Sequence, residues 1–241
     1  MERVALVTGA GRGIGKAIAI AYACSGIKVC CVARTIQEIE NTVREIENGG
    51  GEAISYACDI SKYKEIKAAF KYADEKYGAI DIVVINAGTD CKKVSIEELE
   101  IEEWESVIDV NLSGAFYTAK AAIPYLKQSV GGKIITIGSG MGHKGRANGA
   151  PYNCSKAGLW MLTRTLAQEL IQYGISVNEL IPGPVDTDMG IEIKKDNKSA
   201  FSIDGEWIKL PEDVAELALF LATQHNNGPT AQSFSLMRRE L

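Results

Sequence analysis

The sequence predicts an open, doubly wound α/β fold, in which a parallel sheet lies between layers of helices. Short runs rich in Val, Ile and Leu alternate with longer helical stretches, and several of these runs are continuously apolar. A strand that is buried on both faces has such a pattern, and a parallel sheet covered by helices buries its strands in this way. The seven expected strands are Val4–Thr8, Lys28–Ala33, 52–57, 81–85, Lys133–Ile137, 175–180 and 232–236.

The clearest helical pattern lies between the third and fourth expected strands. In Tyr63–Tyr77 the apolar residues recur at spacings of three and four, which is one stripe of a 3.6-residue period. The chain has neither a Pro- and Ser-rich linker nor an internal repeat, so residues 1–241 are expected to form one domain. Residues 186–207 are charged and irregular, and we expect a mobile substrate loop there.

The composition is that of an ordinary globular protein, with 46% hydrophobic residues and a formal net charge of −5. This mild acidity offers no electrostatic footprint for nucleic acid. No apolar run approaches the roughly 20 residues that span a bilayer, and the N-terminus lacks the features of a signal peptide, so a cytoplasmic protein is expected. Six cysteines without a C-x-x-C pair, and two histidines, predict neither a metal site nor a disulfide framework.

A glycine-rich turn follows the first expected strand and opens a helix. Phosphate groups can approach bare backbone N–H groups at a helix N-terminus where no Cβ intervenes. The strict G-x-G-x-x-G spacing is absent, and a tight turn without a ligand is the alternative. Four glycines within seven residues favour a nucleotide site, whose candidate residues are Thr8, Gly9, Gly11, Arg12, Gly13, Ile14 and Gly15.

The end of the second expected strand indicates the type of dinucleotide. An NAD site has an Asp or Glu there for the ribose 2′-hydroxyl, whereas an NADP site has a cation. This chain has Arg34 at that place and no acid before Glu38. Arg34 can form a fork onto a 2′-phosphate with Arg12 on its other side, although both could simply be solvated. We therefore predict that NADP(H) is favoured over NAD(H).

Tyr152 and Lys156 place a phenol and an ammonium four residues apart, which on a helix puts both on one face. The same spacing occurs twice within Tyr63–Tyr77, where both pairs are expected on a solvated helix face. Ser139 distinguishes the third pair, because it lies 13 residues upstream of Tyr152 and just after the fifth expected strand. The carboxyl ends of strands are where open α/β sheets bind ligands.

Together these features resemble the short-chain dehydrogenase/reductase family. The glycine spacing Thr-Gly-x-x-x-Gly-x-Gly and the Ser139, Tyr152 and Lys156 set are similar to its motifs. The resemblance runs from Val4 to about residue 190 and implies a single-domain Rossmann-type fold. Three further segments in family order are similar too, namely Asn86-Ala87-Gly88, Asp109-Val110-Asn111 and Pro182-Gly183-Pro184-Val185-Asp186-Thr187.

The chemistry of such a set can be stated from the residues. Hydride transfer to a carbonyl leaves an alkoxide, which must receive a proton. A free Tyr has a pKa near 10, and a nearby ammonium favours the phenolate and lowers that pKa. Tyr152 is therefore predicted to be the general acid in reduction and the base in oxidation, with its pKa lowered by Lys156. Ser139 is predicted to donate to the substrate oxygen.

The resemblance adds further expected roles. Asn111 would be the fourth catalytic residue and would hold a water that links Lys156 to solvent. Lys156 would also hydrogen-bond the nicotinamide ribose, and Asp59 would contact the adenine, although capping of a helix over residues 61–65 is an equal alternative for Asp59. The other implied cofactor contacts are Ile60, Asn86, Ala87, Gly88, Tyr152, Pro182, Gly183, Val185 and Thr187.

The chain departs from the family at two places. Ile85 stands where members usually carry a second Asn, and residues 233–241 lack the usual Gly-Gly after the last strand. The contacts made by this end, including Arg238 and Arg239, are left open. In the glycine-rich stretch 138–149, the cations Lys144 and Arg146 and the side chain of His143 either meet a polar substrate or form a solvated rim.

The leading function is an NADPH-dependent reductase of a ketone or aldehyde, acting as a homodimer or homotetramer. A 3-oxoacyl-carrier-protein reductase and a sugar or polyol dehydrogenase remain open within that class. The acidic carrier of the former would want a basic patch, and residues 128–132 and 172–174 offer little such charge. Epimerase relatives have a different glycine spacing and need a longer chain. A non-catalytic NADP-binding regulator is the other alternative, and the intact Ser139, Tyr152, Lys156 and Asn111 set argues against it.

Overall fold

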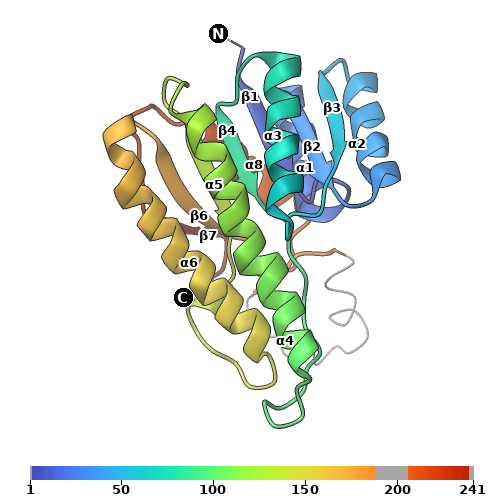
Figure 1. Ribbon diagram of the computed structural model, residues 1–241, viewed down its shortest axis with the longest axis vertical. Coiled ribbons are helices and arrows are strands. Elements are labelled where there is room, and N and C mark those ends of the chain that lie inside the picture. The colour runs from blue at the N-terminus through green and yellow to red at the C-terminus, as the bar shows by residue number, and fades with distance from the viewer. Residues whose placement is uncertain (1, 188–205, 239–241) are drawn as a thin grey trace.

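The computed structural model describes residues 2–187 and 206–238, which form a seven-stranded parallel sheet between two layers of helices (Figure 1). The strand order is β3-β2-β1-β4-β5-β6-β7, and every neighbouring pair is parallel. This confirms the predicted fold class. The strands are β1 (Val4–Thr8), β2 (Lys28–Ala33), β3 (Ala53–Ala57), β4 (Ile82–Ile85), β5 (Lys133–Ile137), β6 (Ser176–Ile181) and β7 (Ser233–Ser235).

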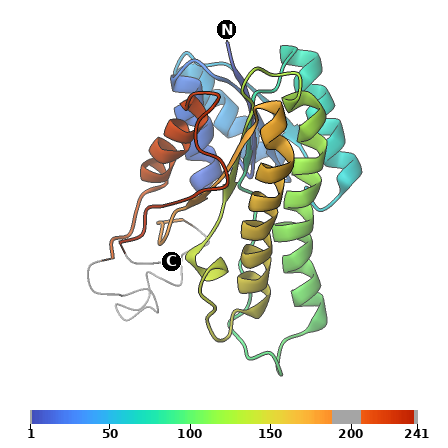
Figure 2. The same cartoon turned by 90° about the vertical axis from the view of Figure 1, so that its left-hand side faces the viewer.

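The helices lie on both faces of the sheet, as the edge-on view shows (Figure 2). One layer holds α1, α2 and α8, and the other holds α3, α5 and α6. A separate apolar core lies under each layer. The α-helices are α1 (Gly13–Cys24), α2 (Ile36–Asn48), α3 (Tyr63–Tyr77), α4 (Ile101–Ile108), α5 (Gly114–Leu126), α6 (Ala150–Leu170) and α8 (Pro211–Thr223), with short helical turns η1 (Asp109–Ser113), η2 (Gly140–Gly142) and η3 (Ile171–Tyr173).

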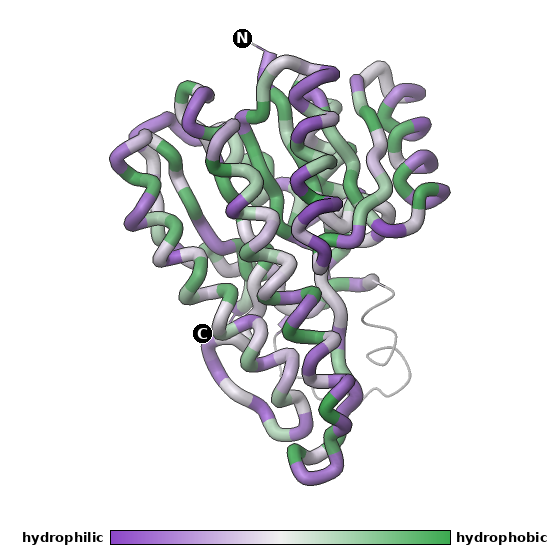
Figure 3. Tube along the Cα trace, viewed as in Figure 1, coloured by the Kyte–Doolittle hydropathy of each residue, from purple (hydrophilic) through white to green (hydrophobic). Residues whose placement is uncertain are grey.

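The continuous apolar pattern of the strands has the expected consequence. All residues of β1, β4, β5 and β6 are buried, and β1 and β4 are mostly green in Figure 3. Each buried Val, Leu or Ile contributes roughly 1.5–3 kcal/mol relative to an exposed one. The outer faces of α2 and α3 are hydrophilic in the same view, so each helix turns its apolar stripe to the sheet.

The strand order reverses at β1, which pairs with β2 on one side and with β4 on the other. At such a reversal the connections leave toward opposite faces and open a crevice beyond the carboxyl ends of the strands. The loops that follow β1, β4, β5 and β6 all reach this edge of the sheet, and they carry the glycine turn, Asn86–Gly88, Ser139 and the segment that begins at Pro182. The fold therefore gathers segments that are far apart in the sequence.

The predicted boundaries agree closely with the structure. Strands β1, β2 and β5 and helix α3 have the predicted bounds, and β3, β4, β6 and β7 differ by one residue at one or both ends. Residues 188–205, the greater part of the expected substrate loop, and Arg239 in the C-terminal end lie outside the described residues. Within the ranges 2–187 and 206–238, the structure contains no helix long and apolar enough to cross a membrane.

Candidate active site

Ser139, Tyr152 and Lys156 meet at the carboxyl end of β5. Ser139 is the second residue after β5 and begins the short turn η2, with its hydroxyl accepting a hydrogen bond from the Met141 N–H at 3.2 Å. A further side-chain hydrogen bond joins Ser139 to Tyr152 on the first turn of α6. The Lys156 ammonium donates to the Ile137 carbonyl at 2.8 Å and lies 5.8 Å from the centre of the Tyr152 ring. The three predicted residues thus form one cluster.

Asn111 lies beside this cluster, on a turn of π-helix. The helices α4 and α5 run into one another through η1, and the extra residue of the π-turn is a feature common at functional sites. The Asn111 amide donates to the Thr89 carbonyl at 2.9 Å and to Ser155 Oγ at 3.1 Å, and its Oδ1 accepts from the Thr89 N–H at 2.7 Å. Asn111 therefore ties the loop after β4 to α6. Its predicted hold on a water stays a prediction.

The pKa values of the pair differ from the expectation. Burial raises the pKa of Tyr152 to about 12, although the hydrogen bond with Ser139 opposes this rise. Burial lowers the pKa of Lys156 to about 8, and the negative charge of Glu179 opposes that fall. The pKa of Tyr152 is thus raised and not lowered as predicted, because desolvation of the phenol outweighs the opposing hydrogen bond with Ser139.

The glycine turn forms a cradle of bare backbone. Gly9 and Gly13 have φ angles of +68° and +53°, which favour glycine. A Cβ on Gly15 would lie 2.3 Å from the Gly9 carbonyl oxygen, so no side chain fits there. Helix α1 begins at Gly13 without a side-chain cap, and its first N–H groups suit a phosphate. The residues present therefore fit the pyrophosphate of a dinucleotide.

The loop after β4 is fastened to this turn. Thr8 Oγ1 accepts hydrogen bonds from the Asn86 and Ala87 N–H groups at 3.0 and 3.2 Å. The Asn86 amide donates to the Thr8 carbonyl at 2.8 Å. A Cβ on Gly88 would lie 3.8 Å from the Lys156 ammonium, so this loop reaches from the phosphate cradle to the catalytic cluster.

The predicted adenosine end presents Arg34 and Asp59 after neighbouring strands. Arg34 is exposed directly after β2. Asp59 accepts from the Ser61 N–H at 3.0 Å and from the Ser61 hydroxyl at 2.8 Å, so it shapes the turn that leads into α3. Glu38 comes four residues after Arg34, and its carboxylate lies 3.9 Å from the Arg12 guanidinium. The Glu38 side chain also lies beside Gly11, because a Cβ on Gly11 would be 2.8 Å from Glu38 Oε2. An acid thus stands near the glycine turn, which the sequence pattern did not indicate.

The loop after β6 completes the crevice. Gly183 follows Pro182 with a φ angle of +70°, and Val185 forms a bridge to Lys209. Thr187 reaches the glycine turn, because its Cγ2 would lie 3.2 Å from a Cβ on Gly13. The motif after β6 and the motif after β1 therefore share one site, as predicted from their positions at strand ends.

Two residues at this edge have surroundings that the sequence did not indicate. His143 is neither a substrate contact nor a solvated rim, since its side chain is only 11% exposed and its Nε2 lies 2.9 Å from Glu179 Oε2. Met237 packs over two loops of the site: its Sδ would lie 2.8 Å from a Cβ on Gly140, and its Cγ would lie 2.9 Å from a Cβ on Gly183. The one signal for Met237 was that the C-terminal end departs from the family pattern.

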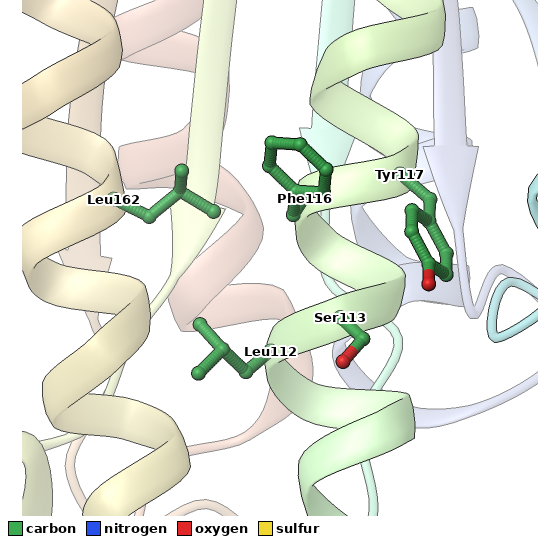
Figure 4. A pocket seen from close by; sticks show the side chains of 5 residues that line it. All are labelled: Leu112, Ser113, Phe116, Tyr117 and Leu162. Carbon is green, nitrogen blue, oxygen red and sulfur yellow. The ribbon is translucent and has the colours of Figure 1, made fainter.

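A hollow of about 380 Å³ lies on the outer side of the helical layer, away from this cluster (Figure 4). It is largely apolar, and Phe116 at its edge is exposed. In the described parts of the chain, no group of three or more His, Cys, Asp or Glu side chains could hold a metal. The hollow is lined by Leu112, Ser113, Phe116, Tyr117 and Leu162.

Comparisons with known proteins agree with this geometry. The family model described as short chain dehydrogenase matches residues 3–198. The chain is 37% identical to a Synechocystis protein named 3-oxoacyl-[acyl-carrier-protein] reductase, over 92% of this chain and 89% of that one. Among solved structures, a variant of actinorhodin polyketide ketoreductase with NADPH has a TM-score of 0.89 at 31% identity, covering 98% of this chain and 95% of that one. A 3-ketoacyl-(acyl-carrier-protein) reductase from Brucella melitensis complexed with NADH has a TM-score of 0.89 at 32% identity, covering 97% and 96%.

Proposed function

This chain belongs to the short-chain dehydrogenase family and is an oxidoreductase, and we propose that it reduces a ketone or aldehyde with NADPH. The observation that carries the proposal is the cluster of Ser139, Tyr152 and Lys156, together with a glycine turn that opens α1 without a side-chain cap. A nicotinamide cofactor, when bound, supplies the hydride. Tyr152, Ser139, Lys156 and Asn111 are the proposed catalytic residues.

Tyr152 is proposed to protonate the oxygen of the substrate. Because burial raises the pKa of Tyr152 to about 12, the phenol carries its proton throughout the physiological range. In its protonated form the phenol can donate to the alkoxide that hydride transfer leaves. Ser139, already bonded to Tyr152, would donate to the same oxygen and orient it. Lys156 would bind the ribose and return a proton to Tyr152.

The cofactor contacts are proposed to run along the edge of the sheet. The cradle of Gly9 to Gly15 would hold the pyrophosphate, and the loops at Asn86–Gly88 and Pro182–Thr187 would enclose the nicotinamide half. Arg34 supports NADPH, because it is exposed where a 2′-phosphate would lie. Glu38 beside Arg12 is the feature that would favour NADH. The solved relatives include one complex with each cofactor, so the preference rests on these side chains.

The substrate class has two candidates, a 3-oxoacyl thioester on a carrier protein and a small free carbonyl compound. The Synechocystis relative bears the name of the first activity. The turns at 128–132 and 172–174, whose low charge argued against an acidic carrier, precede β5 and β6 and lie at the opposite end of the sheet from the site. At the site itself, Lys92, Lys144 and Arg146 are exposed. These cations support an acidic substrate or carrier.

A second copy of the chain is proposed to cover the outer helical layer, giving a homodimer or homotetramer. Phe116 and Met161 are 45% and 52% exposed on α5 and α6, and Phe116 lines the apolar hollow of Figure 4. Exposed apolar residues gathered in this way are typical of an interface. Sedimentation velocity of the wild type and of Phe116→Glu measures this directly: a monomeric wild type would contradict it.

Tyr152→Phe tests the proposed function. The wild type is expected to oxidise NADPH with at least one member of a panel of acyl thioesters, ketones and aldehydes. The reaction is monitored by the loss of NADPH absorbance. Phe cannot supply a proton, so kcat should fall by roughly 10²–10⁴-fold while NADPH still binds. Tyr63→Phe, in the same Tyr-x-x-x-Lys spacing on α3, is the matched control and should keep full activity.

Two outcomes would count against the proposal. Unchanged turnover in Tyr152→Phe would remove Tyr152 from its role as the acid. A wild type that binds NADPH tightly yet reduces no member of the panel would favour the non-catalytic regulator instead.

A further inference from the structure

Glu179 on β6 is a fully buried carboxylate that the mechanism above does not use. Its side chain is 1% exposed. One oxygen, Oε2, accepts from the Ser233 hydroxyl at 2.5 Å and lies 2.9 Å from His143 Nε2. A carboxylate can only accept, so in this pair the His143 Nε2 is assigned as the donor. The carboxylate is therefore held in place from two other elements, β7 and the end of η2.

The second oxygen of Glu179 lies against the peptide that joins two groups of the active site. A Cβ on Gly138 would be 2.0 Å from Oε1, so this carboxylate fits only beside a glycine. Gly138 follows Ile137, whose carbonyl accepts from Lys156, and precedes Ser139, which bonds Tyr152. Oε1 has no hydrogen-bond partner among the described residues. Glu179 thus stands directly behind the strand end that carries the catalytic cluster.

A buried ammonium is costly unless an opposite charge lies near it. Lys156 is 6% exposed, and burial lowers its pKa. The negative charge of Glu179 raises the pKa of Lys156 and so opposes this loss of the proton. Glu179 is the natural counter-charge of the buried lysine.

The other charged and titratable groups around Lys156 act elsewhere. The charge of Asp90 bears on Tyr152, and Lys93 pairs with Asp90 at 2.6 Å. Arg164 packs on the Trp160 ring and donates to the Ala231 carbonyl. The titratable and charged groups around Lys156 and its neighbour Tyr152 come from four elements. They are Tyr152 and Arg164 from α6, Asp90, Cys91 and Lys93 from the loop after β4, His143 from the end of η2, and Glu179 from β6.

We propose that Glu179, held by His143 and Ser233, is a positioning residue that keeps Lys156 as an ammonium ion against the end of β5 and so extends proton delivery at Tyr152 toward alkaline pH. This inference rests on the proposed function, since it gives Lys156 its role there. Glu179 touches neither substrate nor cofactor in this scheme and acts through Lys156.

Glu179→Gln tests the inference, because it removes the charge and keeps the shape. The protein is labelled with lysine carrying ¹³C at Cε, and the Lys156 signal, assigned by its loss in Lys156→Arg, is followed by NMR through a pH titration without cofactor. The pH at the midpoint of the Lys156 titration is expected to be lower by roughly one unit in Glu179→Gln than in the wild type. The alkaline limb of the kcat profile for carbonyl reduction should move down by the same amount. An unmoved midpoint would overturn the inference.

Three further variants keep the result specific. His143→Gln retains a hydrogen-bond donor at the place of Nε2 and leaves the Glu179 carboxylate unchanged. The midpoint of the Lys156 titration in this variant should therefore equal that of the wild type. Asp81→Asn removes a carboxylate that accepts from the Val4 N–H and Ser129 at the other end of the sheet, and it should lower stability without moving the midpoint. Should Glu179→Gln not fold, Glu179→Ala removes the charge without a buried amide, and the same fall is expected.

The two proposals fail in different ways. The titration needs no turnover, so a wild type that reduces no carbonyl compound refutes the proposed function alone. A competent reductase whose Lys156 midpoint is the same in Glu179→Gln and Glu179→Ala refutes the role of Glu179 alone.

Discussion

Replacing Lys156 by Met should change how the stability of the protein depends on pH. Burial lowers the pKa of Lys156 from its ordinary 10.5 to about 8 in the folded state. Between these two values the unfolded chain holds the proton and the folded chain releases it. The unfolded state then binds more protons, so the free energy of unfolding rises with pH. The destabilising effect of this lysine is fully present below about pH 8 and is lost toward pH 10.5.

The magnitude follows from the gap between the two pKa values. A gap of about 2.5 pH units corresponds to roughly 3 kcal/mol of destabilisation at low pH. Along the titration curve about 1 kcal/mol of this is recovered between pH 7 and pH 9. Met also loses the hydrogen bond to the Ile137 carbonyl, but that loss is the same at every pH and cancels from the comparison.

Urea unfolding of the wild type and of Lys156→Met at pH 7, 8 and 9 measures the effect. From pH 7 to pH 9 the free energy of unfolding of the wild type should rise by about 1 kcal/mol relative to that of the variant. Lys67→Met is the matched control, because Lys67 has the same Tyr-x-x-x-Lys spacing on α3 but is exposed. Stability curves that run parallel for the wild type and Lys156→Met would refute the reasoning.

Two further predictions concern the cofactor. Gly15→Ala should abolish tight NADPH binding in a fluorescence titration and destabilise the fold by roughly 1–3 kcal/mol in thermal unfolding, because its Cβ would lie 2.3 Å from the Gly9 carbonyl oxygen. Gly145→Ala, where a Cβ meets nothing within 4 Å, is its control, and equal binding by both variants would contradict the cradle. Arg34→Ala should weaken NADPH at least tenfold more than NADH, since it removes a charged partner of the 2′-phosphate. An equal loss for both, or a wild type that prefers NADH, would overturn the preference.

The fold and the catalytic cluster were predictable because both depend on short stretches of sequence. Nearly continuous apolar runs located strands such as β1 and β4, since strands covered by helices on both faces are mostly apolar. Tyr152 and Lys156 lie one helical turn apart, and Ser139 follows a strand whose end was visible in the sequence. The parallel topology then brings these segments to one edge without further information.

The groups around that cluster were not predictable, because they come from distant segments. Glu179 sits inside the buried strand β6, and its partners His143 and Ser233 lie 36 and 54 residues away. Met237 reaches the site from the end of the chain, and Glu38 approaches Arg12 only after α2 has folded back. No local pattern marks such contacts.

By itself, the sequence determined the order of the elements, the glycine turn and the residues proposed to react, since each is a matter of local spacing and residue type. Only the tertiary structure decided the protonation chemistry. How far a phenol or an ammonium is withdrawn from water depends on atoms that pack around it from the whole chain. That burial raised the pKa of Tyr152, lowered the pKa of Lys156 and set a buried carboxylate behind both.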